Sequence, residues 1–163
     1  MNILIVSADF YTHIAALLVE GAEEALRAAG VSHEVIRVAG ALEIPPAIAF
    51  AAKSEIYDGY IALGCVIRGE TSHYDTVCNE SARGLMDLGV CERLAIGNGI
   101  LTVENEAQAL ARADKAQKNK GAGAVEACLG LIALRQRFLY GEDVIPAQAR
   151  HASAAKQNQS KKG

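Results

Sequence analysis

The regular alternation of short apolar runs with segments of helical periodicity is the sequence feature that most constrains the fold. The segments expected to form strands cover residues 3–6, 34–38, 60–67 and, after a start at 94–96 and an interruption at Asn98-Gly99, 100–103. The continuous apolar run over residues 3–6 is typical of a strand buried on both faces of a sheet. Strands that alternate with helices predict a parallel sheet joined by right-handed crossovers. The sequence therefore predicts an α/β fold, a three-layer flavodoxin-like sandwich with a four-stranded parallel sheet flanked by helices on both faces.

The segments between the apolar runs predict the helices. We expect helices over residues 14–26, from Pro45-Pro46 onward, and over 74–86, 104–118 and 125–139. Apolar residues recur in most of them at the three- and four-residue spacing of a helix with one buried face. Gly30 ends the first helix, and Asn119-Lys120-Gly121 is expected to end the charged helix that precedes it.

Length and composition predict one domain over residues 1–145 and a polar tail over 146–163. A chain of 163 residues can bury a core without a disulfide or a metal. The tail is aperiodic and rich in Ala, Gln, Ser and Lys, so we expect it to be disordered. The net charge of −3 gives no electrostatic footprint for nucleic acid or an anionic membrane.

The cysteines and the N-terminal residues indicate a cytoplasmic protein. None of the four cysteines forms a Cys-x-x-Cys pair, and none has a histidine at zinc-ligand spacing. We therefore interpret them as free thiols in a reducing compartment. The sequence shows no basic signal-peptide region and no apolar stretch long enough for a membrane span.

The loop over residues 68–73 carries the most chemistry. In parallel sheets ligands bind beyond the carboxyl ends of the strands, and this loop leads from a strand into a helix. Gly69 permits close backbone approach, and free N–H groups at a helix start attract phosphate. His73 could transfer protons near neutral pH. The alternatives are a simple capped helix and a surface histidine.

Further candidates lie at the other strand ends. Phe10 could stack on a planar heterocycle, or fold back on the core. Glu43, in the turn over residues 40–43, could accept hydrogen bonds from a polyol, or favour a helix start through the dipole. Arg112 and Lys120 could reach a phosphate from a neighbouring chain, or form a solvated charged face.

Five segments that occur together and in order resemble the lumazine synthase family. They are Gly40-Ala41-Leu42-Glu43-Ile44-Pro45, the run over residues 63–74 that contains Arg68-Gly69-Glu70-Thr71-Ser72-His73, Val77-Cys78-Asn79-Glu80-Ser81, Gly99-Ile100-Leu101-Thr102-Val103-Glu104-Asn105 and Asn119-Lys120-Gly121. The resemblance covers residues 1–140. It implies the condensation of 5-amino-6-(D-ribitylamino)uracil with 3,4-dihydroxy-2-butanone 4-phosphate to 6,7-dimethyl-8-ribityllumazine, phosphate and water. It also implies no metal, no organic cofactor, and a site shared by adjacent subunits of a pentamer.

The resemblance assigns a role to each candidate residue. The pyrimidine ring is expected to stack on Phe10, and His73 is expected to act as the proton shuttle. The remaining expected substrate contacts are Gly40, Ala41, Leu42 and Glu43 for the ribityl chain, Cys65, Val66 and Ile67 for the polar ring edge, and Gly69, Glu70, Thr71 and Arg112 for the phosphate. Lys120 and Asn98 are expected to reach the site of a neighbouring chain.

Two positions depart from the family pattern. Asn98 stands where many members have an aromatic residue, and Gly123 stands where many have an acidic one. An amide at 98 replaces ring packing by a hydrogen bond, which puts ligand affinity in question. The alternative function is therefore a non-catalytic flavin or lumazine binder on the same scaffold. A flavodoxin-like electron carrier is disfavoured because the loop after the first strand lacks a phosphate cradle rich in Ser and Thr.

The expected assembly is a pentamer or a pair of pentamers. Members that form capsids tend to have a segment before the first strand that pairs with a neighbour's sheet. Here the sequence enters the first strand at Asn2. We therefore expect no 60-subunit shell.

Overall fold

The computed structural model describes residues 1–141, in which four strands alternate with five α-helices. The elements are β1 (Asn2–Ala8), α1 (Thr12–Ala28), β2 (Ser32–Val38), the short 3₁₀ helix η1 (Ala41–Glu43), α2 (Ile44–Ala52), β3 (Gly59–Ile67), α3 (His73–Cys91), β4 (Ile96–Val103), α4 (Glu106–Ala113) and α5 (Lys120–Tyr140). The predicted tail over 146–163 lies outside the described residues, as do residues 142–145 of the predicted domain.

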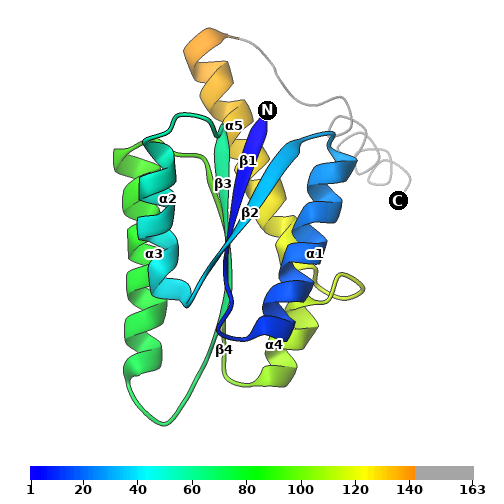
Figure 1. Cartoon of the computed structure of the whole chain (residues 1–163), viewed down its shortest axis with the longest axis vertical. Helices are drawn as coiled ribbons and strands as arrows, with labels where there is room; N and C mark the ends of the chain where they lie inside the picture. The colour runs from blue at the N-terminus through cyan, green and yellow to red at the C-terminus, as the bar shows by residue number, and fades with distance from the viewer. Residues whose placement is uncertain (142–163) are drawn as a thin grey trace, which may run out of the picture.

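The sheet is fully parallel with strand order β2-β1-β3-β4. Helices α2 and α3 cover one face, and α1, α4 and α5 cover the other (Figure 1). This arrangement confirms the predicted three-layer flavodoxin-like sandwich. All four strands run toward the same edge, so the loops after β1, β2 and β3 meet there.

The core consists of two layers, one on each side of the sheet. Alternate residues of β1 point to opposite layers, with Ile3 and Ile5 on the α1 side and Leu4 and Val6 on the α2 side. The central strand β3 is buried along almost its whole length. The sheet is therefore a rigid platform beneath the loops at its carboxyl edge.

Strand β4 is continuous from Ile96 to Val103, so the predicted interruption at Asn98-Gly99 is wrong. A Cβ atom on Gly97 would collide with the carbonyl group of Ala124 on α5, and one on Gly99 would lie 3.1 Å from Cβ of Ala124. The glycines allow α5 to pack directly against the strand. Glycine here serves close packing and does not break the strand, which periodicity alone cannot distinguish.

The predicted charged helix also ends earlier than expected, at Ala113, and Lys120 begins α5 instead of ending α4. The Asp114 carboxylate accepts the N–H of Ala116 at 2.8 Å, which favours a turn. Asn119 adopts a left-handed conformation (φ 42°), and its side chain accepts the N–H of Ala122 at the start of α5.

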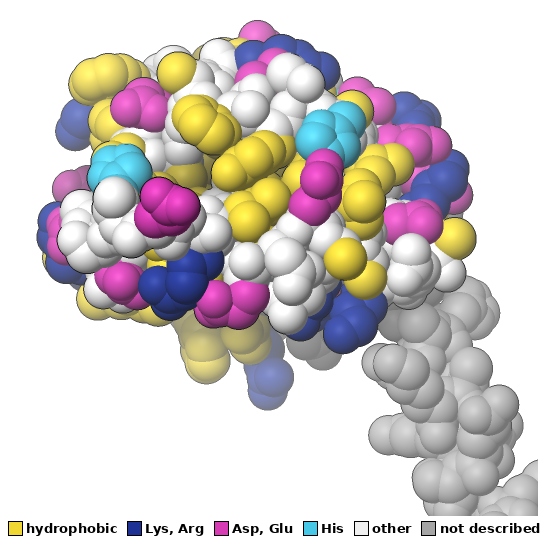
Figure 2. Space-filling view, turned by 90° about the horizontal axis from the view of Figure 1, so that it is seen from below, with side chains coloured by type: hydrophobic (Ala, Val, Ile, Leu, Met, Phe, Trp, Pro, Cys, Tyr) yellow, Lys and Arg dark blue, Asp and Glu magenta, His cyan; other side chains and the backbone are white. Residues whose placement is uncertain are grey.

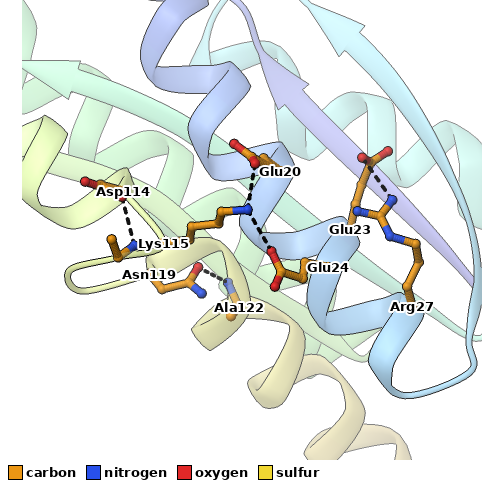
Figure 3. A network of polar contacts seen from close by, with 9 residues as sticks. Glu20, Glu23, Glu24, Arg27, Asp114, Lys115, Asn119 and Ala122 are labelled. Carbon is orange, nitrogen blue, oxygen red and sulfur yellow. Dashed lines mark hydrogen bonds and ion pairs between the residues drawn. The ribbon is translucent and has the colours of Figure 1, made fainter.

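The connection between α4 and α5 is held against α1 by Lys115. Its ammonium group lies 2.8 Å from Glu20 and 3.0 Å from Glu24 (Figure 3). Lys115, one of the charged residues that favoured a helix in the sequence, thus makes tertiary ion pairs. Among residues 1–141, no helix combines the length and the apolar character needed to cross a bilayer.

Candidate functional site

A cavity of about 380 Å³ opens at the carboxyl ends of β1, β2 and β3. Figure 2 views this end of the molecule, where apolar side chains gather at the centre and acidic, basic and histidine side chains surround them. The cavity is lined by Phe10, Tyr11, Ala39, Gly40, Ala41, Leu42, Glu43, Cys65, Val66, Ile67, Gly69, Thr71, His73, Tyr74 and Val77. The structure thus brings together most of the predicted site residues from three separate loops.

An exposed aromatic ring stands at the mouth of this cavity. Phe10 is 73% exposed, and its ring meets that of Tyr11 edge to face, with centroids 5.0 Å apart. Tyr11 is half-buried and packs against the core on the α1 side. One face of the Phe10 ring is therefore free to stack on a flat ligand.

The second wall is the turn between β2 and α2. Gly40 is extended, and the N–H of Glu43 donates to its carbonyl oxygen at 3.2 Å, which closes the turn η1. A Cβ atom on Gly40 would lie 3.1 Å from Oε2 of Glu43. The absence of a side chain at Gly40 leaves backbone groups and the Glu43 carboxylate together as hydrogen-bonding partners for a polyol.

The third wall is the end of β3, residues 65–67. Burial, and then the nearby Cys78, raises the pKa of the Cys65 thiol to about 11. The thiol is therefore protonated at neutral pH and does not act as a nucleophile there. This part of the wall offers apolar surface and strand-end backbone groups.

Arg68 anchors the loop that follows β3. Its guanidinium group lies 2.9 Å from Glu104 and 3.3 Å from Asp75, and it stacks 4.0 Å from the centroid of the Tyr74 ring. Its backbone N–H donates to the Val103 carbonyl oxygen at 2.9 Å. The charge of Arg68 is therefore already matched by two carboxylates, and the residue ties the loop to β4 and α3.

The start of α3 is open to an anion. The N-cap residue of this helix is Ser72, and within residues 1–141 its side chain makes no capping hydrogen bond. The Thr71 hydroxyl accepts the N–H of His73 at a long 3.4 Å, and the space around Gly69 is empty. Uncapped N–H groups and the positive end of the helix dipole favour a phosphate here. His73 is exposed beside Thr71 in the same cavity, within reach of a bound ligand.

Four of the predicted site residues do not line the cavity. Glu70 is exposed between two residues that do. Asn98 lies within β4, not in a loop at its end, and its Oδ1 accepts the N–H of Ile100 at 2.9 Å. Arg112 lies on α4 and donates to the carbonyl oxygen of Gln108 at 3.0 Å, and Lys120 is exposed at the start of α5.

Sequence reasoning missed Tyr11, Ala39, Tyr74 and Val77 as parts of the cavity wall. Tyr74 and Val77 lie on the first turns of α3, one and four residues after His73, so helical spacing from His73 could have found Val77. Tyr11 follows Phe10 directly. Its position directly after the candidate Phe10 is the sequence signal that could have found it.

Within residues 1–141, no lysine or arginine lines the cavity. Its ionisable side chains include Glu43 and His73, and the nearest arginine along the loop, Arg68, is paired with Glu104 and Asp75. A dianionic phosphate bound at the start of α3 would thus have backbone N–H groups but no free cation from the cavity wall.

Comparison with known proteins identifies the family. The profile of 6,7-dimethyl-8-ribityllumazine synthase matches residues 1–136. A protein of that name from Novosphingobium aromaticivorans is 62% identical over 135 residues, which cover 83% of this chain and 96% of the relative. Its namesake from Bartonella tribocorum is 60% identical over 138 residues (84% and 91%), and that from Sphingopyxis alaskensis is 57% identical over 140 residues (86% and 99%). With its cavity at the carboxyl edge of a parallel sheet, the chain belongs to the 6,7-dimethyl-8-ribityllumazine synthase family.

Proposed function

We propose that the protein condenses 5-amino-6-(D-ribitylamino)uracil with 3,4-dihydroxy-2-butanone 4-phosphate to 6,7-dimethyl-8-ribityllumazine, phosphate and water. The observation that carries the proposal is a single cavity with a free aromatic ring at its mouth and an uncapped helix start with an exposed histidine in its wall. The two ends match a flat ring and a phosphate. Membership of the family supports the same reaction.

The pyrimidine substrate occupies the side of the cavity formed by Phe10 and the turn over residues 40–43. Its ring stacks on Phe10, and its ribityl hydroxyls bond to Glu43 and to the turn backbone. The backbone of residues 65–67 meets the polar edge of the ring. The second substrate places its phosphate against residues 69–71, at the start of α3.

The site is completed by a second copy of the chain. The cavity wall of residues 1–141 supplies no free cation for the phosphate. Arg112 and Lys120 are basic, but they lie outside the cavity of their own chain. Within the described residues, Arg112 has no carboxylate partner. We therefore assign Arg112, and with it Lys120 and Asn98, to the site of a neighbouring subunit in a pentamer or a pair of pentamers. The exposed Phe50 and Met86 on the outer side of α2 and α3 offer apolar surface for such contacts.

His73 moves protons during the reaction. Imine formation, phosphate elimination and ring closure each need a proton transferred, and an imidazole beside the bound substrates can do this near neutral pH. Holding two substrates in one cavity supplies much of the remaining acceleration.

All four cysteines are free thiols, which fits the cytoplasmic setting expected from the sequence.

One assay separates this function from mere binding. The purified protein is mixed with both substrates, and lumazine fluorescence and phosphate release are followed together. We expect both signals to rise in equal amounts. Binding of riboflavin without product would instead favour the non-catalytic binder. Analytical centrifugation tests the shared site, because a monomer active at low concentration would exclude it.

A further inference from the structure

The residue directly before Phe10 is attached to β2 at two points. The Asp9 carboxylate receives two hydrogen bonds from Nη1 of Arg37, at 2.7 and 3.0 Å, and the Asp9 N–H donates to the Val38 carbonyl oxygen at 2.9 Å. Asp9 is half-buried, with 29% of its side chain exposed. One bond comes from the backbone and the others from the side chain, so both the position and the direction of the chain at Asp9 are fixed.

This attachment matters because Phe10 has little else to hold it. Its side chain is 73% exposed, and its ring pairs with that of Tyr11 in a T-shaped contact. A ring with so few packing contacts takes its position mainly from the backbone that carries it. The backbone is set one residue earlier, at Asp9.

The same strand carries the opposite wall of the cavity. Arg37 lies near the end of β2, which leads through Ala39 into the turn over residues 40–43. The Asp9–Arg37 pair therefore joins the loop that bears Phe10 to the strand that bears the turn. The phosphate end is held separately, since Arg68 ties its loop to Glu104 and Asp75.

We propose that Asp9 and Arg37 are positioning residues that set the separation between Phe10 and the turn over residues 40–43, and so govern binding of the pyrimidine substrate alone. The inference rests on the proposed function, which places the ring on Phe10 and the ribityl chain at that turn. Neither residue lines the cavity. Each acts through the wall that it fixes.

The test compares the Michaelis constants of the two substrates. Arg37→Met removes the pair, and we expect the pyrimidine KM to rise about three- to fivefold, the fold-change that matches one exposed ion pair. The KM of butanone phosphate and the turnover number stay unchanged. Arg37→Lys keeps the charge with a different donor geometry, so it restores the pyrimidine KM only in part. Equal rises in both KM values, or no rise, would overturn the proposal.

Arg83→Met is the matched control. Arg83 is also an exposed arginine, paired with Glu80 and Asp87 at 2.7 and 2.6 Å, but it lies further along α3 and does not line the cavity. We expect both KM values to stay at the level of the unaltered protein. A selective rise in the pyrimidine KM in this variant would mean that any lost surface pair has the same effect, and would overturn the proposal.

A double-mutant cycle with Phe10→Ala tests the positioning role of Arg37 separately from the proposed binding site. If Phe10→Ala leaves the pyrimidine KM unchanged, the ring does not stack there and the proposed site itself is wrong. If Phe10→Ala raises that KM, we expect Arg37→Met to add nothing further in the Phe10→Ala background, because its effect passes through the ring. Additive effects would refute the positioning role and leave the proposed function intact.

Discussion

The carboxyl edge of the sheet and the region from Arg112 to Lys120, where α4 leads into α5, differ in the basic side chains that they carry. The first has a cavity of about 380 Å³ with walls from three loops, but, within residues 1–141, no lysine or arginine in its lining. The second carries Arg112 and Lys120 but does not line this cavity. Within the described part of the chain, the first region thus has a cavity without a lysine or arginine side chain, and the second has such side chains outside that cavity. The proposed function makes them two parts of one phosphate site, which do not meet within residues 1–141 of a single chain.

The two regions are also stabilised in different ways. Two of the cavity loops extend directly from the buried strands β1 and β3, and Arg68 ties the loop after β3 to Glu104 and Asp75. The α4–α5 connection is held on the other face of the sheet by Lys115 and by the close contact of α5 with α1. Changes in one region should therefore leave the other folded, which makes the division testable.

Removing Arg112 should have the largest effect. We expect Arg112→Ala to lower kcat/KM by about 10²–10³-fold, because the phosphate loses the guanidinium group that we assign to it. Steady-state kinetics with both substrates measures this loss. Lys118→Ala, at an exposed lysine of the same connection, is the control and should retain full activity. A loss of less than twofold in Arg112→Ala would mean that the two regions do not act together.

Mixed assemblies sharpen the same comparison. Gly69→Asp puts a negative charge in the open space where the phosphate is expected, without a steric clash in the fold. Neither this variant nor Arg112→Ala should be appreciably active alone. Assembled together in equal amounts, they should regain about a quarter of the normal activity, since sites with an intact cavity and an intact Arg112 then form between chains. No recovery would place the whole site within one chain.

His73→Ala should have a smaller effect on activity than Arg112→Ala. We expect kcat to fall about ten- to a hundredfold, at or below the low end of general acid–base contributions, because the cavity still holds both substrates together. Single-turnover measurements of product fluorescence check this. A loss as complete as that of Arg112→Ala would contradict the division between proton transfer and substrate capture.

Two glycines on α5 test how the basic connection is held. A Cβ atom on Gly121 would collide with the Leu18 carbonyl oxygen of α1, whereas one on Gly123 meets nothing within 4 Å. We expect Gly121→Ala to lower the free energy of unfolding by about 1–3 kcal/mol through overpacking. Gly123→Ala should raise it by about 0.5–1 kcal/mol through helix propensity. Denaturant unfolding measures the free energy of unfolding of both variants. Equal changes in the two would contradict the role of α1 in positioning the start of α5.

The buried thiol of Cys128 should produce the smallest effect near neutral pH. Burial raises its pKa to about 11 from an ordinary value of 9.0, so the folded state favours the protonated form. Stability from this group is fully present below pH 9 and is lost as pH rises toward 11. We expect Cys128→Ala to flatten the decline of the unfolding free energy over that range. An unchanged pH profile would show that this thiol does not govern the decline.

The sequence predicted the layers because they follow from local periodicity, whereas much of the cavity lining, residues 40–42 and 65–67, was predicted through the resemblance to the family. Four apolar runs and their strand-end loops were enough to predict a parallel sheet and to bring Phe10, Glu43 and His73 to one edge. The sequence-based prediction was wrong where a residue packs against, or pairs with, an element that is distant in the chain. Gly99 allows α5 to approach β4, and Lys115 pairs with α1, so neither acts as its neighbours in the chain imply.

The double attachment of Arg68 has a consequence for the kinetics of substrate capture. Because Glu104, Asp75 and the Tyr74 ring hold this loop in place, the phosphate that we propose to bind there would meet a surface that is already ordered. Little conformational entropy is then lost on association, so affinity is not spent on ordering the loop. The encounter rate should accordingly be set by diffusion, with no slow closing step of this loop.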